Sequence, residues 1–262
     1  MMRNLLFNFK LNKSSQAARL LFSAMILLSS LLIGTLSSQA ATVDDRIENF
    51  IYNDPKPEKT VYLTFDDGPS NYTLQILDLL EELDVPAIFF VIGENLEIVP
   101  NAEDSLKEVI HRGHYIGLHS MTHNMDHLYN VPNAPQNFVN EMIEVREKIK
   151  ELTGGFESHL CRPPYGGKTH FKPGHYKALE EAGIECVDWN VDSLDWAKSS
   201  ADQIFNQVVS DLKRSQFPNE VVLLFHEKKL TLEVLPRVIE YYRDLGYVFM
   251  PYYEGEEFEC LK

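Results

Sequence analysis

Two neighbouring carboxylates, Asp66 and Asp67, come directly after the apolar run at residues 61–65 and before Gly68 and Pro69. Two adjacent negative charges repel each other unless a cation or an arginine lies close by. The same residues could form a simple capped turn, because Asp, Gly and Pro are common turn residues. The pair therefore indicates either a turn or one side of a site that holds positive charge.

Two histidines, His119 and His123, follow a second apolar run, at residues 115–118. If this segment is helical, residues at i and i+4 share one face. Imidazole nitrogens at that spacing suit Zn²⁺ or a similar divalent ion. Together with one carboxylate of the Asp66–Asp67 pair, they would form a two-histidine, one-carboxylate site with positions left for water and substrate.

Three further polar residues, Arg162, Asp195 and His226, also follow apolar runs. Hydrolysis at a metal site needs a base that takes a proton from water and an acid that protonates the leaving nitrogen. A carboxylate that does not bind the metal could be the base, held ionised by Arg162. His226 could be the acid, held protonated by the charge of Asp195.

The elements that must position these residues are short apolar runs that alternate with longer, helix-like segments. The runs are 61–65, 87–92, 115–118, 159–161, 184–189, 221–225 and 247–250, and the helix-like segments are 71–83, 95–112, 137–152, 173–182, 201–213 and 230–245. Seven strands separated by helices imply parallel strands with crossover connections. The carboxyl ends of such strands share one edge, where α/β folds build their sites. An open α/β sheet and a barrel both fit this alternation.

Charge divides the chain into two parts. The 262 residues carry a net charge of −15, yet all 39 acidic residues and all but four of the 24 basic ones follow residue 40. A basic start, an apolar run at 20–36 and small residues at 38–41 are typical of a secretory signal, although the run also reaches the lower limit for a membrane anchor. We therefore predict a signal peptide or anchor over residues 1–40 and a linker over 41–59. The rest should be exported: secreted, associated with the cell wall, or anchored to the membrane.

The acidic balance and the cysteines exclude two classes of site. Nucleic-acid binding is not expected, because phosphate backbones are held by Lys and Arg. The three cysteines are too few and too widely spaced for a disulfide framework or a cysteine zinc site. Cys161 and Cys186 close two apolar runs, so we expect both to be buried. The sequence carries no clear indication of oligomeric state.

Five short motifs resemble, in order and spacing, those of polysaccharide deacetylases with a NodB homology domain (carbohydrate esterase family 4). They are Thr64–Pro69, His119–His123, Arg162–Tyr165, Asp192–Trp196 and Leu223–His226. The resemblance covers roughly residues 60–250 and implies a catalytic domain over residues 60–255. It also implies an α/β fold, a distorted (β/α) barrel of about seven parallel strands, and so favours the barrel over the open sheet.

The resemblance assigns a metal site and a base. It implies that Asp67, His119 and His123 bind one divalent ion, with Zn expected and Co or Mn as alternatives. Asp66 matches the general base of the family. Arg162 matches the arginine that orients this base.

The other matching positions concern the substrate and the leaving group. Tyr165 matches the residue whose backbone N–H helps to hold the oxyanion. His226 matches the general acid, and Asp195 matches its partner. Trp196 and Leu224 match apolar residues that line the pocket for the acetyl methyl group.

The function that the resemblance implies is hydrolysis of the N-acetyl group of N-acetylglucosamine units, with peptidoglycan as the expected polymer and acetate as the product. Chitin or its oligomers are alternative substrates, and acetylxylan esterase activity would use the same site. A catalytically silent protein that binds the cell wall is an alternative of another class. The complete set of candidate ligands, base and acid favours an enzyme. Which polymer is used depends on subsite loops that carry no readable code.

Overall fold

The structure, a computed structural model, describes residues 56–258. In this range the strands are β1 (Thr60–Gly68), β2 (Ala87–Val91), β3 (Tyr115–Leu118), β4 (Leu160–Cys161), β5 (Glu185–Cys186), β6 (Val191–Asp192), β7 (Glu220–His226) and β8 (Val248–Phe249). They form one parallel sheet in the order β5-β4-β3-β2-β1-β7-β6, and β8 also pairs with β1. The predicted distorted (β/α) barrel is confirmed, with β6 as one strand more than the seven predicted runs.

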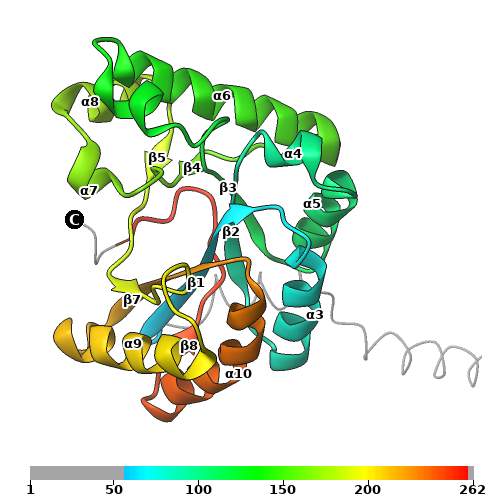
Figure 1. Cartoon of the computed structure of the whole chain (residues 1–262), viewed down its shortest axis with the longest axis vertical. Coiled ribbons are helices and arrows are strands. Elements are labelled where there is room, and N and C mark those ends of the chain that lie inside the picture. The colour runs from blue at the N-terminus through cyan, green and yellow to red at the C-terminus, as the bar shows by residue number, and fades with distance from the viewer. Residues whose placement is uncertain (1–55, 259–262) are drawn as a thin grey trace, which may run out of the picture. The chain divides into compact units, whose positions relative to one another are not determined.

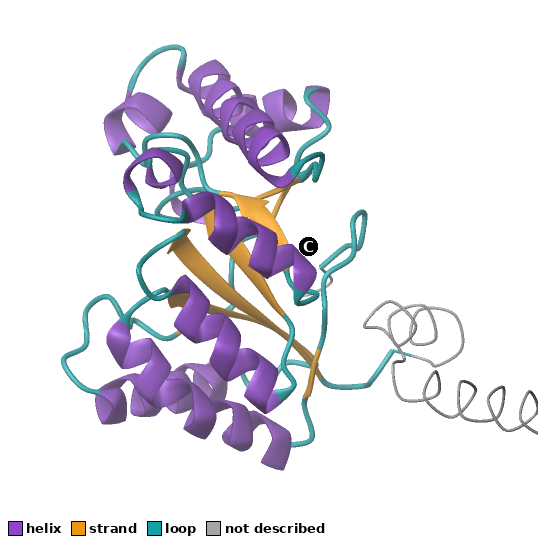
Figure 2. Ribbon diagram, turned by 90° about the vertical axis from the view of Figure 1, so that its right-hand side faces the viewer, coloured by secondary structure: helices purple, strands orange, loops and turns teal. Residues whose placement is uncertain are grey.

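Helices surround the strands (Figures 1 and 2). They are α3 (Thr73–Leu83), α4 (Asn95–Ile98), α5 (Ala102–His111), α6 (Ala134–Thr153), α7 (Gly167–His170), α8 (Pro173–Glu181), α9 (Ala201–Arg214) and α10 (Lys229–Asp244), with a π-helical turn, η1 (Asp126–Asn130). Around the sheet, α9 contacts α10, and contacts continue through α3, α5 and α6 to α8. The segment predicted as one helix over 95–112 is two helices, because Pro100 and the left-handed Asn101 (φ 60°) interrupt it.

The two longest strands, β1 and β7, form the centre of the core. Nearly all of their residues are buried, as expected for parallel strands covered on both faces. The rings of Phe65 in β1 and Phe89 in β2 stack with centroids 5.0 Å apart. The register of β1 and β7 places Asp66 opposite His226, so two motifs that are distant in the sequence lie side by side.

The barrel is open between β5 and β6. These strands follow each other in the sequence but occupy opposite ends of the strand order.

The segment after β8 packs against the end of the sheet that lies away from the candidate site. Tyr252 lies edge-on to Tyr115, the first residue of β3, with ring centroids 4.6 Å apart. Phe258 packs in the same way on Tyr62 in β1, at 4.9 Å. This segment, red in Figure 1, therefore covers the amino ends of the strands.

The predicted signal peptide or anchor at residues 1–40 and most of the predicted linker at 41–59 lie outside the described residues. The last residues of that linker contact the folded domain: Lys56 Nζ pairs with Glu220 Oε2 at 2.9 Å, and Lys59 Nζ donates to the carbonyl of Leu245. Among residues 56–258, no helix has both the length and the apolar character needed to cross a membrane.

The two described cysteines differ in exposure. Cys161 is buried, as predicted, but Cys186 is exposed, and both are free thiols. The prediction for Cys186 was wrong because β5 is the last strand of the open sheet, with β4 as its neighbour and no strand beyond it.

Candidate active site

The predicted site residues meet at the carboxyl ends of the strands. Asp66 and Asp67 lie near the end of β1, His119 follows β3, and Arg162 follows β4. Two more positions complete this edge, since Asp195 follows β6 and His226 ends β7. The topology of the sheet therefore gathers motifs that span 160 residues of the sequence.

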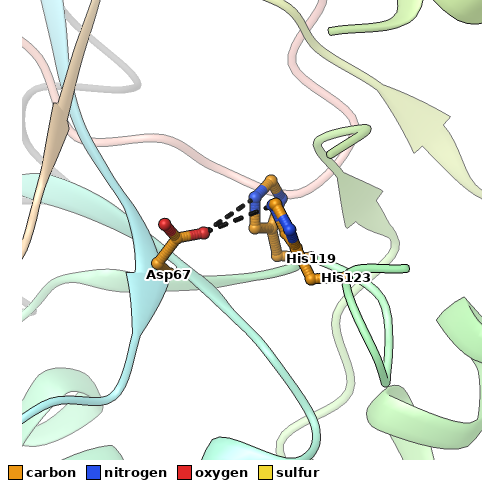
Figure 3. Close-up of side chains that lie close together, drawn as sticks. All are labelled: Asp67, His119 and His123. Atoms are coloured by element: carbon orange, nitrogen blue, oxygen red, sulfur yellow. Dashed lines mark ion pairs between the residues drawn. The ribbon is translucent and has the colours of Figure 1, made fainter. Parts of the chain in front are cut away.

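Three of these side chains converge on one point (Figure 3). Asp67 Oδ1 lies 3.4 Å from His119 Nε2 and 3.5 Å from His123 Nε2. One ligand atom from each residue lies within 4.8 Å of the others. Asp67 Oδ1 is itself buried and has no hydrogen-bond partner. A buried carboxylate oxygen without a partner is costly, so this donor set fits a divalent cation.

Hydrogen bonds on the far side of each imidazole leave both Nε2 atoms free. His119 Nδ1 lies 2.8 Å from the carbonyl oxygen of Arg162, which can only accept, so Nδ1 carries the hydrogen. The Tyr165 hydroxyl donates to the carbonyl of His123 and lies 3.0 Å from His123 Nδ1, which therefore donates to it. Each ring thus keeps its Nε2, the nitrogen available to a metal, directed towards Asp67.

Electrostatics favour an ionised Asp67 and a neutral His123. Burial acts to raise the pKa of the Asp67 carboxyl, but His119, His226 and His123 outweigh it and hold this pKa well below its usual value. Burial, with His119 beside it, lowers the pKa of His123. An ionised carboxylate beside a neutral imidazole is the combination that a divalent ion requires.

The segment that carries the histidines is a turn and not a helix, so the helical spacing considered for His119 and His123 does not apply. Ser120 and His123 both have left-handed backbones, with φ of 66° and 54°, which a regular helix does not allow. Ser120 Oγ accepts the backbone N–H of His123 at 2.9 Å. This turn brings the two imidazole centroids to 5.1 Å from each other.

The candidate base, Asp66, lies against the arginine. Asp66 is 3% exposed, and its Oδ1 accepts a hydrogen bond from Arg162 Nη1 at 2.9 Å. Its Oδ2 lies 3.8 Å from His119 Nε2, next to the candidate metal ligands. Arg162 is fully buried and also donates to Thr64 Oγ1 and to the carbonyls of residues 187 and 188. The guanidinium therefore fixes the base and compensates its charge.

The candidate acid, His226, is held by Asp195. His226 Nδ1 lies 2.7 Å from Asp195 Oδ1, while the backbone N–H of His226 and the hydroxyl of Thr231 donate to Oδ2. Burial acts to lower the pKa of the His226 imidazole, but Asp195 outweighs it, aided by Asp66 and Asp67, and the pKa is raised. His226 Nε2 lies 3.9 Å from Asp67 Oδ2, so its free nitrogen faces the same point as the ligands.

The remaining predicted positions differ in exposure. Tyr165 has a left-handed backbone, with φ of 64°, and a half-exposed ring, while Trp196 is 61% exposed. Leu224 is buried in β7, where its Cα pairs with Thr64 in β1 and with Asp192 in β6. The family resemblance implies a role for the backbone N–H of Tyr165, whereas the contact of its hydroxyl with His123 was not predicted.

Two buried glutamates beside the site were not singled out from the sequence. Glu141 in α6 accepts the backbone N–H groups of Met121 and Thr122, between the two histidines. Glu227, after β7, accepts the backbone N–H of Ser70 at 2.9 Å and the hydroxyl of Thr73. Only one pattern in the sequence could have indicated either residue: Glu141 interrupts the apolar face of its helix.

Comparison with known proteins gives consistent matches. A sequence model of the family described as polysaccharide deacetylase matches residues 53–187. A peptidoglycan-N-acetylglucosamine deacetylase from Bacillus cereus is 35% identical over 209 residues, which cover 78% of this chain and 72% of the relative. The crystal structure of the polysaccharide deacetylase Bc1974 from Bacillus cereus has 34% identity and a TM-score of 0.68, covering 76% of this chain and 95% of that one. A Streptococcus mutans CE4 esterase has 30% identity and the same TM-score, with coverages of 79% and 90%.

The family match covers part of the site. The range matched by the family contains the Asp66–Asp67 pair, the two histidines and Arg162. The similarity to the Bacillus relative extends over most of both chains, and the solved structures share the fold. The resemblance seen in the motifs is thereby confirmed. The chain belongs to the polysaccharide deacetylases of the NodB type, carbohydrate esterase family 4, a family of deacetylase hydrolases.

Proposed function

We propose that the protein is an exported, metal-dependent deacetylase that removes acetyl groups from N-acetylglucosamine units of peptidoglycan. The observation that carries the proposal is the buried, unpartnered Asp67 Oδ1, which faces the Nε2 atoms of His119 and His123. The name of the Bacillus cereus relative supports the choice of polymer. The basic and then apolar N-terminus, followed by a strongly acidic remainder, supports export to the cell wall or secretion.

Asp67, His119 and His123 would hold the metal ion. Two imidazoles and one carboxylate suit Zn²⁺, and Co²⁺ or Mn²⁺ are alternatives. When bound, such an ion polarises a carbonyl group and lowers the pKa of water. The protein contributes the fixed tautomers of the two histidines, which require no rearrangement before binding.

In the hydrolytic step, Asp66 accepts the proton of the attacking water. Its Oδ1 is already bonded to Arg162, so Oδ2, which lies 3.8 Å from His119 Nε2, is the oxygen available for that proton. The backbone N–H of Tyr165 donates to the oxyanion that develops from the acetamide carbonyl. Trp196 and Leu224 line the pocket for the methyl group.

His226 completes the reaction. Its Nε2–H donates a proton to the leaving amine as the C–N bond breaks, which releases acetate and leaves a glucosamine unit. Asp195 accepts the Nδ1–H of the ring, so the imidazolium form is stabilised until its proton is transferred. The two proton carriers, Asp66 and His226, lie opposite each other in the β1–β7 register.

Three alternatives remain distinct from this proposal. The Streptococcus mutans structure is described as a CE4 esterase, which supports ester hydrolysis, as in acetylxylan, as a second activity of the same site. Chitin or its oligomers would be deacetylated by the same chemistry. A catalytically silent wall-binding protein would need neither base nor acid, whereas this site holds both.

The test is release of acetate by the full-length protein from peptidoglycan, chitin oligomers and acetylated xylan. We expect the fastest release from peptidoglycan, complete loss after treatment with a chelator, and recovery when Zn²⁺ is returned. Faster release from one of the other polymers would reassign the substrate. Absence of release from all three, with the metal bound, would favour the silent wall-binding protein.

Export is tested separately by sequencing the N-terminus of the protein recovered outside the cytoplasm. A mature end near Ala41 indicates a cleaved signal peptide, whereas an intact N-terminus in the membrane fraction indicates an anchor. Recovery in the cytoplasm alone would contradict export.

A further inference from the structure

Glu141 is a buried carboxylate in α6 that the catalytic scheme above does not use. It is 5% exposed and lies in a helix whose buried face is otherwise formed by residues such as Phe138, Met142 and Val145. A charged side chain on such a face is expensive unless hydrogen bonds compensate it. A carboxylate at this position therefore needs strong hydrogen-bond donors.

Its partners are the backbone groups between the two histidines. Glu141 Oε2 accepts the N–H of Met121 at 3.0 Å and the N–H of Thr122 at 2.9 Å. The Thr122 hydroxyl lies 2.9 Å from Oε1. His127 Nε2, on the half-exposed side, lies 3.6 Å from the same Oε1. One carboxylate thus binds two consecutive backbone donors of the turn that carries both imidazoles.

This turn is also fixed by the segment that directly continues β2. The N–H of Gly93 donates to the carbonyl of Ser120, and the N–H of Glu94 donates to the carbonyl of Met121, both at 2.9 Å. The two segments are so close that a Cβ on Gly93 would lie 2.0 Å from Met121 Sδ. The turn is therefore held between β2 and α6, and Glu141 supplies the contact from α6.

We propose that Glu141 is a positioning residue of the metal site. Its carboxylate holds the Met121–Thr122 backbone so that the left-handed turn persists and His119 and His123 both point at Asp67. Glu141 is not a ligand and does not contact the substrate in this scheme. The inference rests on the proposed metal dependence and adds the residue that prepares the ligand geometry.

The test is the affinity of the purified full-length protein for Zn²⁺, measured by competition with a chromophoric chelator. Glu141→Ala is expected to weaken binding by about 10- to 100-fold, the usual effect of removing a group that orients metal ligands. Glu144→Ala, an exposed change one turn nearer the C-terminal end of the same helix, is the matched control and should leave the affinity unchanged. Equal affinity of wild type and Glu141→Ala would overturn the inference.

Two further variants separate positioning from charge and remain informative if Glu141→Ala does not fold. Glu141→Gln retains an oxygen that reaches both N–H groups but loses the charge, whereas Glu141→Asp retains the charge on a shorter side chain. Positioning predicts tighter Zn²⁺ binding by the Gln variant than by the Asp variant, and a Co²⁺ absorption spectrum in the Gln variant like that of the wild type. The reverse order would show that charge alone matters and would overturn the inference.

The same measurement distinguishes this inference from the proposed function. If the wild-type protein binds no Zn²⁺, the metal-dependent function fails and the inference fails with it. If the wild type binds Zn²⁺ and releases acetate while Glu141→Ala binds it equally well, only the role of Glu141 is wrong.

Discussion

Asp66 and Asp67 are adjacent in the sequence, yet their side chains meet different partners at the same point of the site. In a regular strand, consecutive side chains point to opposite faces of the sheet. Asp67 instead has a left-handed backbone with φ of 64°, and both Asp66 Oδ2 and Asp67 Oδ1 lie near His119 Nε2, at 3.8 and 3.4 Å. The side-chain amide of Asn95 donates to the carbonyl of Asp67 at 2.8 Å and helps to hold this bend. A strained residue therefore lets neighbouring carboxylates take separate roles.

For these two carboxylates, we expect Asp66→Asn to abolish deacetylase activity while the protein still binds the metal ion. The amide keeps an oxygen for Arg162 to donate to, but it cannot take a proton from water. We expect kcat for acetate release to fall by about 10²- to 10⁴-fold, the usual contribution of a general base. Metal content, measured by atomic emission, should match the wild type.

The exposed carboxylate Asp104 in α5 provides a matched control, since Asp104→Asn makes the same chemical change far from the site. That variant should keep full activity. Near wild-type turnover by Asp66→Asn would mean that another group is the base.

Between elements, Glu227 ties the end of β7 to the segment that joins β1 to α3. Its carboxylate accepts the Ser70 N–H and the Thr73 hydroxyl, and a Cβ on Gly68 would lie 2.3 Å from Glu227 Oε1. Burial raises the pKa of the Glu227 carboxyl and outweighs the opposite effect of the hydrogen bonds from Thr73 and Ser70. The contact therefore joins the residue after β7 to the start of α3, close in sequence to the bend at Asp67.

Glu227→Ala should therefore lower stability. It removes two hydrogen bonds, those from the Ser70 N–H and the Thr73 hydroxyl to the carboxylate, and each is worth about 0.5–1.5 kcal/mol in the free energy of unfolding. Glu227→Gln retains the acceptor and should stay close to the wild type in a urea titration. Glu233→Ala, an exposed change in α10, is the control, and equal unfolding midpoints for all the variants would contradict this role.

Gly117 in β3 is a second contact between elements. Its Cα pairs with that of Phe90 in β2, and a Cβ at this position would lie 2.4 Å from atoms of the Phe90 ring. The Arg162 guanidinium also lies against this ring, 4.2 Å from its centroid. We expect Gly117→Ala to displace Phe90 and to cost about 1–3 kcal/mol of unfolding free energy, as overpacking usually does.

A smaller ring neighbour should relieve that clash. The double variant Gly117→Ala/Phe90→Leu should be more stable in urea than the two single changes would predict if their effects were additive. Additive losses would show that the Phe90 ring is not what excludes a side chain from position 117.

For the molecule as a whole, the predictable consequence of burial is a dependence of stability on pH. His114 lies in the turn before β3, and its Nδ1 accepts the backbone N–H of Ala87 at 3.1 Å, so the buried ring is neutral. Burial, with a smaller effect of Arg112, lowers its pKa from 6.5 to about 4. The unfolded chain binds a proton below pH 6.5 and the folded protein only below about pH 4. Stability that is present above pH 6.5 is therefore lost as the pH falls to about 4, in total roughly 3 kcal/mol.

The measurement is the free energy of unfolding in urea between pH 7 and pH 4. Because other histidines titrate in the same range, the informative quantity is the difference between wild type and His114→Gln, which keeps an acceptor for Ala87. The variant should lose less stability on acidification, whereas exposed His111→Gln should follow the wild type. Parallel curves for wild type and His114→Gln would contradict the assignment.

Much of this architecture could be predicted because its central strands are buried on both faces. Such strands read as continuous apolar runs, which is why residues 61–65 and 221–225 were identified directly. Parallel pairing then places whatever follows each run at one edge of the sheet. The positions of the candidate ligands, base and acid follow from that rule together with the family resemblance.

The features that could not be predicted from the sequence depend on contacts between residues far apart in the chain. The turn at 119–123 has a left-handed backbone at two positions. Two of its N–H groups, those of Met121 and Thr122, donate to Glu141, which lies 19 residues beyond Thr122. Glu227 and Ser70 are 157 residues apart. No local pattern predicts which residues such a glutamate contacts, because a glutamate in a helix or after a strand is usually a solvated surface charge.

The open seam of the barrel gives Arg162 a second constraint. Its guanidinium donates to the carbonyls of Val187 and Asp188, in the connection between β5 and β6, and also to Asp66, so it forms a bridge from that connection to the central strand β1. Replacing it would remove that bridge and leave Asp66 buried without its cation, and breaking a buried pair costs about 3–5 kcal/mol. Loss of activity and loss of folding are therefore inseparable at this position. An inactive protein that still folds, for trapping glycan or for immunisation, is better made with the isosteric change Asp66→Asn, which keeps the arginine and an oxygen for it to donate to.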